Sequence, residues 1–198
     1  PLHLALSYDE EIGCVGVRSL IDMLAAAPVK PAMCIVGEPT AMAIATGHKG
    51  KTAIEAACVG SAAHSALAPQ AVNAIHLACD LIAQIRHLQD DMITDGAQDS
   101  AYDIPYTTLH AGLITSGVAL NIVPDHAVVT FEIRNLAADD PEAILHRLRR
   151  AIAPVIAAAH KRAAKADIVF KVINSYPGLE TSLDEAVVAM VAELTGRD

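Results

Sequence analysis

The chain has 198 residues, of which 53% are hydrophobic and 19% charged, and its formal net charge is -9 at pH 7. This length is enough to bury a core, and the composition is typical of globular rather than disordered or fibrous proteins. No apolar run reaches the roughly 18 residues that a membrane-spanning helix needs, so we expect no membrane partner. Asp and Glu (23) outnumber Lys and Arg (14) and leave no basic stripe, which argues against a nucleic-acid partner.

The four cysteines lie in separate apolar stretches and form no CxxC pair, a pattern that predicts small buried side chains in a reducing cytoplasm: Cys14, Cys34, Cys58 and Cys79. The chain opens with PLHLALS, which has neither an initiator methionine nor the layout of a signal peptide. We therefore expect a cytoplasmic location and a portion of a longer reading frame.

The first 40 residues read as strand, loop, helix and strand. An apolar run at 2–7 is followed by an acidic triplet and by helical spacing over 17–24, and a second apolar run at 32–36 ends at Gly37. Continuous apolar runs of this kind predict strands of a parallel sheet that are buried on both faces. Ligands gather at the carboxyl ends of such strands, where Glu10, Glu11 and Glu38 would lie.

The middle of the chain predicts a sheet with helices on one face. Alternating patterns indicate half-buried strands within 47–59, 107–116, 126–134 and 166–174. Two helices separate them: one has Val72, Ile75, Cys79, Ile82 and Ile85 at helical spacing, and the other follows the start signal Asp139-Asp140-Pro141 and has Ile144, Leu145, Leu148, Ile152, Val155 and Ile156. The order is that of the split β-α-β arrangement, whose uncovered face or edge strand favours self-association.

A last helical pattern begins after Pro177-Gly178. With boundaries near 41–46 and 175–180, we expect an α/β protein in which residues 1–45 and 176–198 are parts of one parallel-sheet domain. Residues 46–175 would form an inserted α+β domain.

Adjacent carboxylates suit metal-assisted hydrolysis, because one can bind a metal ion while the other moves the proton of a bound water. Glu10 and Glu11 offer this combination, and a solvated acidic turn is the alternative. Glu38 follows the second apolar run, where a charge is costly unless it is paired or coordinated, although it could also be a turn cap. Zinc usually needs three protein ligands, and the nine histidines contain no HExxH pair, so further ligands must lie elsewhere.

Three more side chains are candidates for binding or catalysis. His64 lies in a stretch of small residues between a strand and a helix, and a cap of the following helix is its structural alternative. Asn121 and Arg134 could bind a substrate carboxylate, although most such residues are ordinary turn and surface groups.

Seven segments in this order resemble the dinuclear zinc aminoacylase and carboxypeptidase family: SYDEEIGCVG, CIVGEPT, GHKGK, GSAAHSALAPQAVNAI, PYTTLHAG, ALNIVPDHAVVTFEIR and YPGLET. GHKGK, PYTT and FEIR are more similar to its acetylornithine deacetylase branch than to its succinyl-diaminopimelate desuccinylase branch. The resemblance implies a partial zinc-exopeptidase catalytic domain with an inserted ferredoxin-like dimerisation domain. It also implies a homodimer that hydrolyses N-acetyl-L-ornithine to acetate and L-ornithine in arginine synthesis.

The resemblance implies a role for each candidate. Glu10 would be the general base, Glu11 and Glu38 would each bind one of two zinc ions, and cobalt is the alternative metal. His64 would reach the active site of the partner subunit and stabilise the oxyanion, while Asn121 and Arg134 would hold the substrate carboxylate.

The resemblance also implies that three of the five metal ligands lie outside these residues, so the chain alone would be inactive. Two alternatives stay open. The chain could be a non-catalytic dimerisation module, or the intact protein could be a sibling amidohydrolase such as a succinyl-diaminopimelate desuccinylase.

Overall fold

The computed structural model describes residues 2–196 and divides the chain into two compact units. The sheet unit is Lys49–Leu179, and the flanking unit consists of the residues on either side of it. The domain boundaries near 41–46 and 175–180 stay predictions. Within the part of the chain that the structure describes, no helix combines the length and apolarity needed to cross a membrane.

The sheet unit is built on four long strands and two long helices. In chain order these are β2 (Lys51–Val59), α2 (Ala74–Thr94), β4 (Thr108–Ser116), β6 (His126–Arg134), α3 (Pro141–His160) and β7 (Asp167–Tyr176). The strands lie in the order β4-β6-β2-β7, and every neighbouring pair is antiparallel. This confirms the predicted split β-α-β arrangement.

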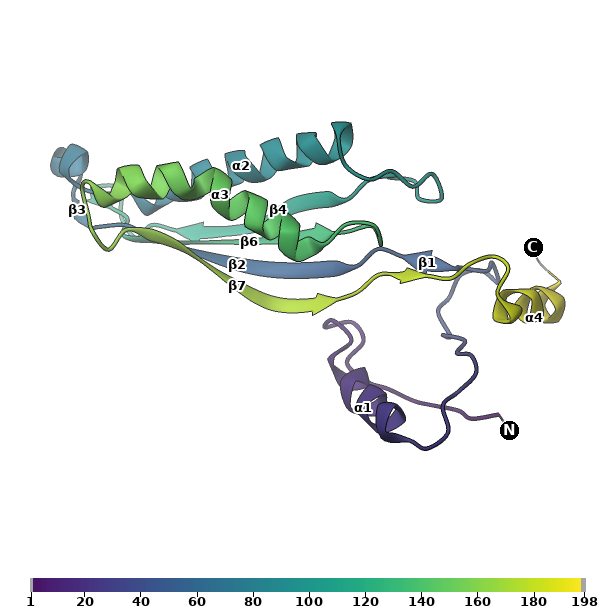
Figure 1. Ribbon diagram of the computed structural model, residues 1–198. Helices are drawn as coiled ribbons and strands as arrows, with labels where there is room; N and C mark the ends of the chain where they lie inside the picture. Colours follow the sequence, from purple (N-terminus) through teal and green to yellow (C-terminus); the bar gives the residue numbers. More distant parts are fainter. Residues whose placement is uncertain (1, 197–198) are drawn as a thin grey trace. The chain divides into compact units, whose positions relative to one another are not determined.

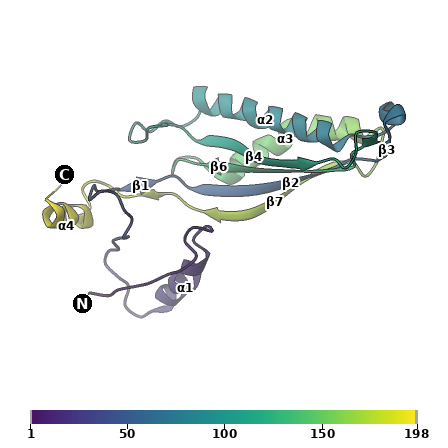
Figure 2. The same cartoon turned by 180° about the vertical axis from the view of Figure 1, so that it is seen from behind.

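Both helices cover the same face of the sheet, as Figure 1 and the reverse view in Figure 2 show. Alternate residues of the two central strands are buried beneath them, namely Thr52, Ile54, Ala56 and Cys58 of β2 and Ala127, Val129, Phe131 and Ile133 of β6. The residues between these positions face the other side of the sheet, which we call the open face. The alternation of side chains that predicted the strands therefore separates a buried face of the sheet from a half-exposed face.

The helix faces agree with the sequence for α3 and differ for α2. In α3, Ile144, Leu145, Leu148 and Ile152 are buried as predicted, and Asp140 caps the helix by accepting a hydrogen bond from Glu142 N at 3.0 Å. In α2 the buried stripe is Ala74, Leu77, Ala78, Leu81, Ile85, Leu88 and Met92. Of the predicted stripe within the helix, only Ile85 is buried, because the leucines define a better continuous face than Ile75, Cys79 and Ile82.

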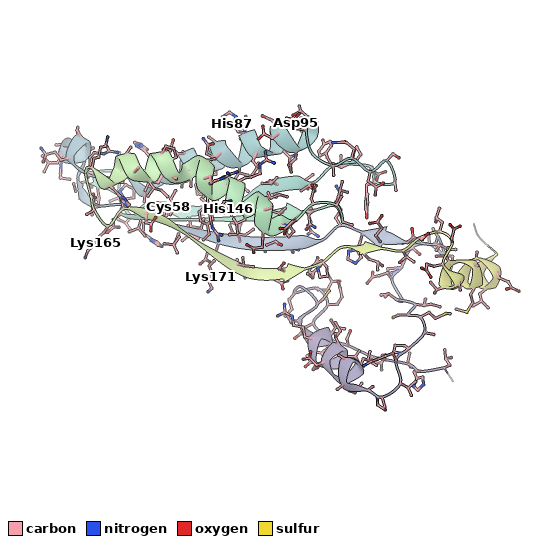
Figure 3. The ribbon with its side chains drawn as sticks, in the orientation of Figure 1. Cys58, His87, Asp95, His146, Lys165 and Lys171 are labelled. Atoms are coloured by element: carbon pink, nitrogen blue, oxygen red, sulfur yellow. The ribbon has the colours of Figure 1, made fainter. Side chains whose placement is uncertain are left out.

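The prediction that all four cysteines are buried is wrong for three of them. Cys58 is buried in the core, on β2 (Figure 3), and burial raises the pKa of its thiol to about 11. Cys14 is half-buried, and Cys34 and Cys79 are exposed. Apolar neighbours in sequence do not bury a side chain when the segment lies at the surface or when the residue lies off the helix stripe.

Short elements complete the two units. At the end of the sheet unit where β2 ends, β3 (Ala63–His64) pairs with β5 (Ile122–Val123), and the 3-10 helix η2 (Ser65–Gln70) follows β3. Where the chain passes between the units, β1 (Gly47–His48) pairs with β8 (Leu179–Glu180). The flanking unit contains the 3-10 helix η1 (Val15–Val17), α1 (Arg18–Ala26) and α4 (Ala186–Thr195), at the positions where helices were predicted.

The two predicted strands of the flanking unit do not form. The structure assigns no strand to residues 2–7 or 32–36, and both runs are exposed, with Leu2 fully so. A buried strand needs neighbours that satisfy its backbone N–H and C=O groups and cover its side chains. Apolar composition alone supplies neither, so these runs stay extended and irregular.

We expect Leu145→Ala to lower the free energy of unfolding of the sheet unit by about 2 to 5 kcal/mol, because it leaves a cavity where α3 packs on the sheet. Leu120→Ala makes the same chemical change at a fully exposed position and should change stability by less than about 0.5 kcal/mol. Urea unfolding followed by circular dichroism measures both values. Equal losses would contradict the assignment of this core.

Candidate functional site

The acidic pair of the flanking unit lies in an exposed turn. The backbone carbonyl of Glu10 accepts hydrogen bonds from the N–H groups of Gly13 and Cys14, each at 2.9 Å. The side chains of Glu10 and Glu11 are both exposed. The two carboxylates therefore lie next to each other in a turn that is open to solvent, and their roles stay predictions.

Glu38 is exposed as well, and no strand precedes it. The expectation that its charge lies at the end of a buried strand is wrong, because the preceding run has no neighbouring strand. Among residues 2–196, no three His, Cys, Asp or Glu side chains come together in a group that could hold a metal ion. Two glutamates do not make a zinc site, so the described residues do not by themselves fit the zinc ions that the resemblance implies.

His64 ends β3 and caps the 3-10 helix that follows it. Its Nδ1 accepts a hydrogen bond from Ala66 N at 3.2 Å, which confirms the capping role expected as the structural alternative. An accepting Nδ1 carries no proton, so the neutral ring carries its proton on Nε2. The side chain is exposed, and an Nε2–H group that points away from the cap is a competent hydrogen-bond donor to a ligand.

Asn121 is beside His64. Its backbone carbonyl accepts a hydrogen bond from Ser65 N at 2.9 Å, and His64 pairs with Ile122 across the two short strands. Asn121 is also exposed. The structure therefore brings these two predicted site residues together at one end of the sheet, near β3 in Figure 1.

Arg134 lies at the opposite end of the same sheet. It is the last residue of β6, whose first residue, His126, lies at the end where β3 and β5 are found. Eight residue steps along an extended strand cover about 26 Å. Asn121 and Arg134 of one chain therefore cannot hold the same carboxylate, and the structure separates a pair that the sequence placed together.

The guanidinium of Arg134 is held in a charged cluster on the open face. Arg134 Nε donates to Glu132 Oε1 at 2.9 Å, and Lys51 Nζ lies 3.6 Å from Glu132 Oε2. Burial raises the pKa of Glu132, but hydrogen bonds and charge from Arg134 and Lys51 lower that pKa further, and the net shift is downward. The hydrogen bond with Glu132 raises the pKa of Arg134. Glu132 and Arg134 therefore both stay charged over a wide pH range.

A buried polar network fixes the backbone next to Arg134. Asn135 and Gly50 exchange backbone hydrogen bonds of 2.9 and 3.1 Å, and a side chain on Gly50 would meet Asn135 Oδ1 at 2.6 Å. Thr107 Oγ1 donates to Asp139 and accepts from Leu136 N at 2.9 Å. These bonds join β2, β6 and the start of β4, so Arg134 projects from a rigid sheet end.

Lys49 fixes the loop before β4 by hydrogen bonds at the Arg134 end of the sheet. Its Nζ donates to the carbonyls of Ile104 at 2.8 Å and Tyr106 at 2.6 Å, and it lies 5.5 Å from the ring centre of Tyr102. Partial burial lowers the pKa of Lys49, whereas the charge of Asp99 raises it, and the net shift is downward. The loop is therefore part of the rigid end of the sheet.

Sequence reasoning missed Lys51 and Glu132. The alternation in HAVVTFEIR already places Glu132 and Arg134 on one face of a strand, which is a signal for the pair. No local pattern shows that Lys51 joins them, because this depends on the register of β2 against β6. His87 and His146, labelled in Figure 3, are exposed on α2 and α3 and take no part in the cluster.

Comparison with known proteins shows relatives over the full length of the chain. Acetylornithine deacetylase of Aliivibrio fischeri (strain MJ11) is 27% identical over 198 residues, which are all of this chain and 50% of that protein. A probable carboxypeptidase of Aspergillus terreus is 33% identical over 153 residues, which are 77% of this chain and 35% of that protein. The chain thus spans about half the length, or less, of the curated relatives it matches.

Solved structures and a family profile agree on the fold. The crystal structure of aminopeptidase PepT from Bacillus cereus ATCC 10987 matches with a TM-score of 0.54 and 26% identity, over 77% of this chain and 37% of that one. Residues 46–160, more than half of the chain, match the peptidase dimerisation domain. With its antiparallel sheet, two covering helices and open face, the chain belongs to the peptidase dimerisation domain family.

Proposed function

We propose that this chain is the dimerising part, with adjoining catalytic segments, of a metal-dependent amidohydrolase that acts on an N-acyl amino acid. The observation that supports this most is that the sheet unit presents a histidine donor at one end and a carboxylate-binding arginine at the other. The relatives named acetylornithine deacetylase support N-acetyl-L-ornithine as the substrate, with acetate and L-ornithine as products. This reaction would place the protein in arginine synthesis in the cytoplasm.

The roles of the glutamates rest on the resemblance. Glu10 would accept the proton of the attacking water and deliver it to the leaving nitrogen. Glu11 and Glu38 would bind zinc, or cobalt, only together with donors beyond those that the described residues bring together. The exposed position of all three side chains leaves them accessible to such donors.

The separation of His64 from Arg134 favours an active site shared between two copies. A small substrate cannot span about 26 Å, so the two side chains of one chain would serve different substrates. The resemblance implies that His64 reaches the active site of the partner subunit. We therefore assign His64 and Asn121 to the active site of the partner, and Arg134 to that of its own chain.

The edge strand β4 is the surface we propose for pairing. It contains no Asp, Glu, Lys or Arg, and Leu113 is 69% exposed on it. The other edge, β7, carries Asp167 and also Lys171, which is labelled in Figure 3. Charged groups on an edge strand oppose pairing with another chain. Twofold antiparallel pairing along β4 would bring the His64 end of each copy toward the Arg134 end of the other.

Two other functions stay open as alternatives. A non-catalytic dimerisation module is favoured by the lack of a metal-binding group among residues 2–196. A sibling amidohydrolase, such as a succinyl-diaminopimelate desuccinylase, would share the fold and the carboxylate-binding arginine. Comparing the two acyl substrates on the full-length protein separates the deacetylase from the desuccinylase.

Glu10→Gln in the full-length protein should lower turnover of N-acetyl-L-ornithine by about 100-fold or more, because it removes the general base. Metal content, measured by mass spectrometry, should not change. Glu193→Gln is the matched control at an exposed position of α4, and it should keep wild-type turnover. Undiminished activity of the Glu10 variant would contradict the role of Glu10 as the general base.

Mixing two inactive variants tests the shared active site. His64→Ala and Arg134→Ala should each be nearly inactive alone, whereas a refolded equimolar mixture should regain about a quarter of wild-type activity. The reason is that about half of the dimers are mixed, and each mixed dimer holds one intact site. A mixture as inactive as its components would show that both side chains act within one chain.

Leu113→Lys should convert the dimer to a monomer, because it places a charge on the proposed pairing edge. Val169→Lys makes a comparable change on the β7 edge, where Val169 is 52% exposed, and should leave the dimer intact. Light scattering at micromolar concentration measures the mass, and thermal unfolding checks that both variants fold. Dissociation by the Val169 variant alone would assign the interface to β7.

A further inference from the structure

The strand register arranges the open face into two rows of side chains at the Arg134 end. In the first row, Thr108 pairs with Arg134 and Lys51 with Tyr176, and the pairing of Thr52 with Ile133 places Lys51 opposite Arg134. This row therefore contains two hydroxyls, a guanidinium and an ammonium, all of which can donate hydrogen bonds to an anion.

The second row lies two residues further along each strand and has a different composition. In it Glu132 is flanked by His110 on β4 and by Ala53 on β2. Glu132 is its only carboxylate. The two rows are two residues apart along the strands, or about 6.6 Å. At the Arg134 end, the open face therefore presents a cationic row beside the carboxylate of Glu132.

We propose that Glu132 is a specificity-determining residue that binds the side-chain ammonium of a diamino acid substrate, while Arg134 and Lys51 bind its carboxylate. This rests on the proposed function, because it takes Arg134 as the anchor for the substrate carboxylate. It goes further by naming the group that distinguishes ornithine from an amino acid with an uncharged side chain.

Distances within the cluster show which ion pair the ligand would exchange. Glu132 Oε1 is held by Arg134 Nε at 2.9 Å, whereas Oε2 has only long contacts, at 3.6 Å to Lys51 and 3.5 Å to Arg134 Nη2. A substrate ammonium can take Oε2, and Lys51 then turns to the substrate carboxylate. In this arrangement each charged group of the ligand and of the cluster has an opposite charge beside it. The cost of removing water from these groups is therefore small for a ligand that carries both a carboxylate and an ammonium.

The exposure of the cluster also suits this ligand. The side chains of Lys51, Glu132 and Arg134 are 25%, 28% and 40% exposed, so they are partly desolvated and still reachable. When a ligand lacks the ammonium, Glu132 Oε2 stays paired with Lys51. Such a ligand gains only the contact between its carboxylate and Arg134.

Binding to the chelator-treated full-length protein tests this without turnover. Isothermal titration with Nα-acetyl-L-ornithine and with Nα-acetyl-L-norvaline, which lacks only the ammonium, should show about tenfold tighter binding of the first by the wild type. Glu132→Gln should remove this preference, and Glu132→Asp should keep part of it. Glu55→Gln, the matched change on the same face of β2, should keep all of it.

Three results would overturn the proposal: equal binding of both ligands by the wild type, equal weakening of both by Glu132→Gln, or an unchanged preference in that variant. Equal weakening would mean that Glu132 only positions Arg134. Thermal unfolding of the variants excludes misfolding as the cause. Failure of the proposed function is a separate result, namely no hydrolysis of any N-acyl amino acid by the metal-loaded wild-type protein.

Discussion

The central position of β2 determines how the rest of the sheet unit is built. Its backbone bonds to β6 in one continuous register on one side, and to β7 on the other side with an irregularity between Ala53 and Ile54. Because side chains alternate along each strand, this register sends one set of residues beneath α2 and α3 and the other set to the open face. A shift of one residue would exchange Ile54 and Glu55 between the two faces.

The same register makes the two ends of the sheet chemically different. At one end, two short strands and a 3-10 helix present His64 and Asn121 with little apolar cover. At the other end, the charged side chains of Lys51, Glu132 and Arg134 rest on a backbone held by the Asn135 and Gly50 pair. Because the strands are rigid, these ends cannot approach each other within one chain, so a site that needs both requires a second copy.

The flanking unit shows which elements a local sequence pattern can predict and which it cannot. Its helices form where helical periodicity predicted them, since a helix satisfies most of its backbone hydrogen bonds internally. Its predicted strands do not form, since a strand satisfies these bonds only with neighbours. The exposed apolar side chains of residues 2–7 and 32–36 are the result, and Glu38 is exposed for the same reason.

The sequence by itself determined the order and type of the elements in the sheet unit, because periods of 2 and 3.6 residues are local properties that any buried face imposes. It also identified His64 and Arg134 as candidate binding side chains from their local sequence surroundings. Only the tertiary structure decided that Asn121 belongs with His64 rather than with Arg134, and that Lys51 joins Glu132. These relations depend on strand register and on the length of β6, which bring together or separate residues that are distant in sequence.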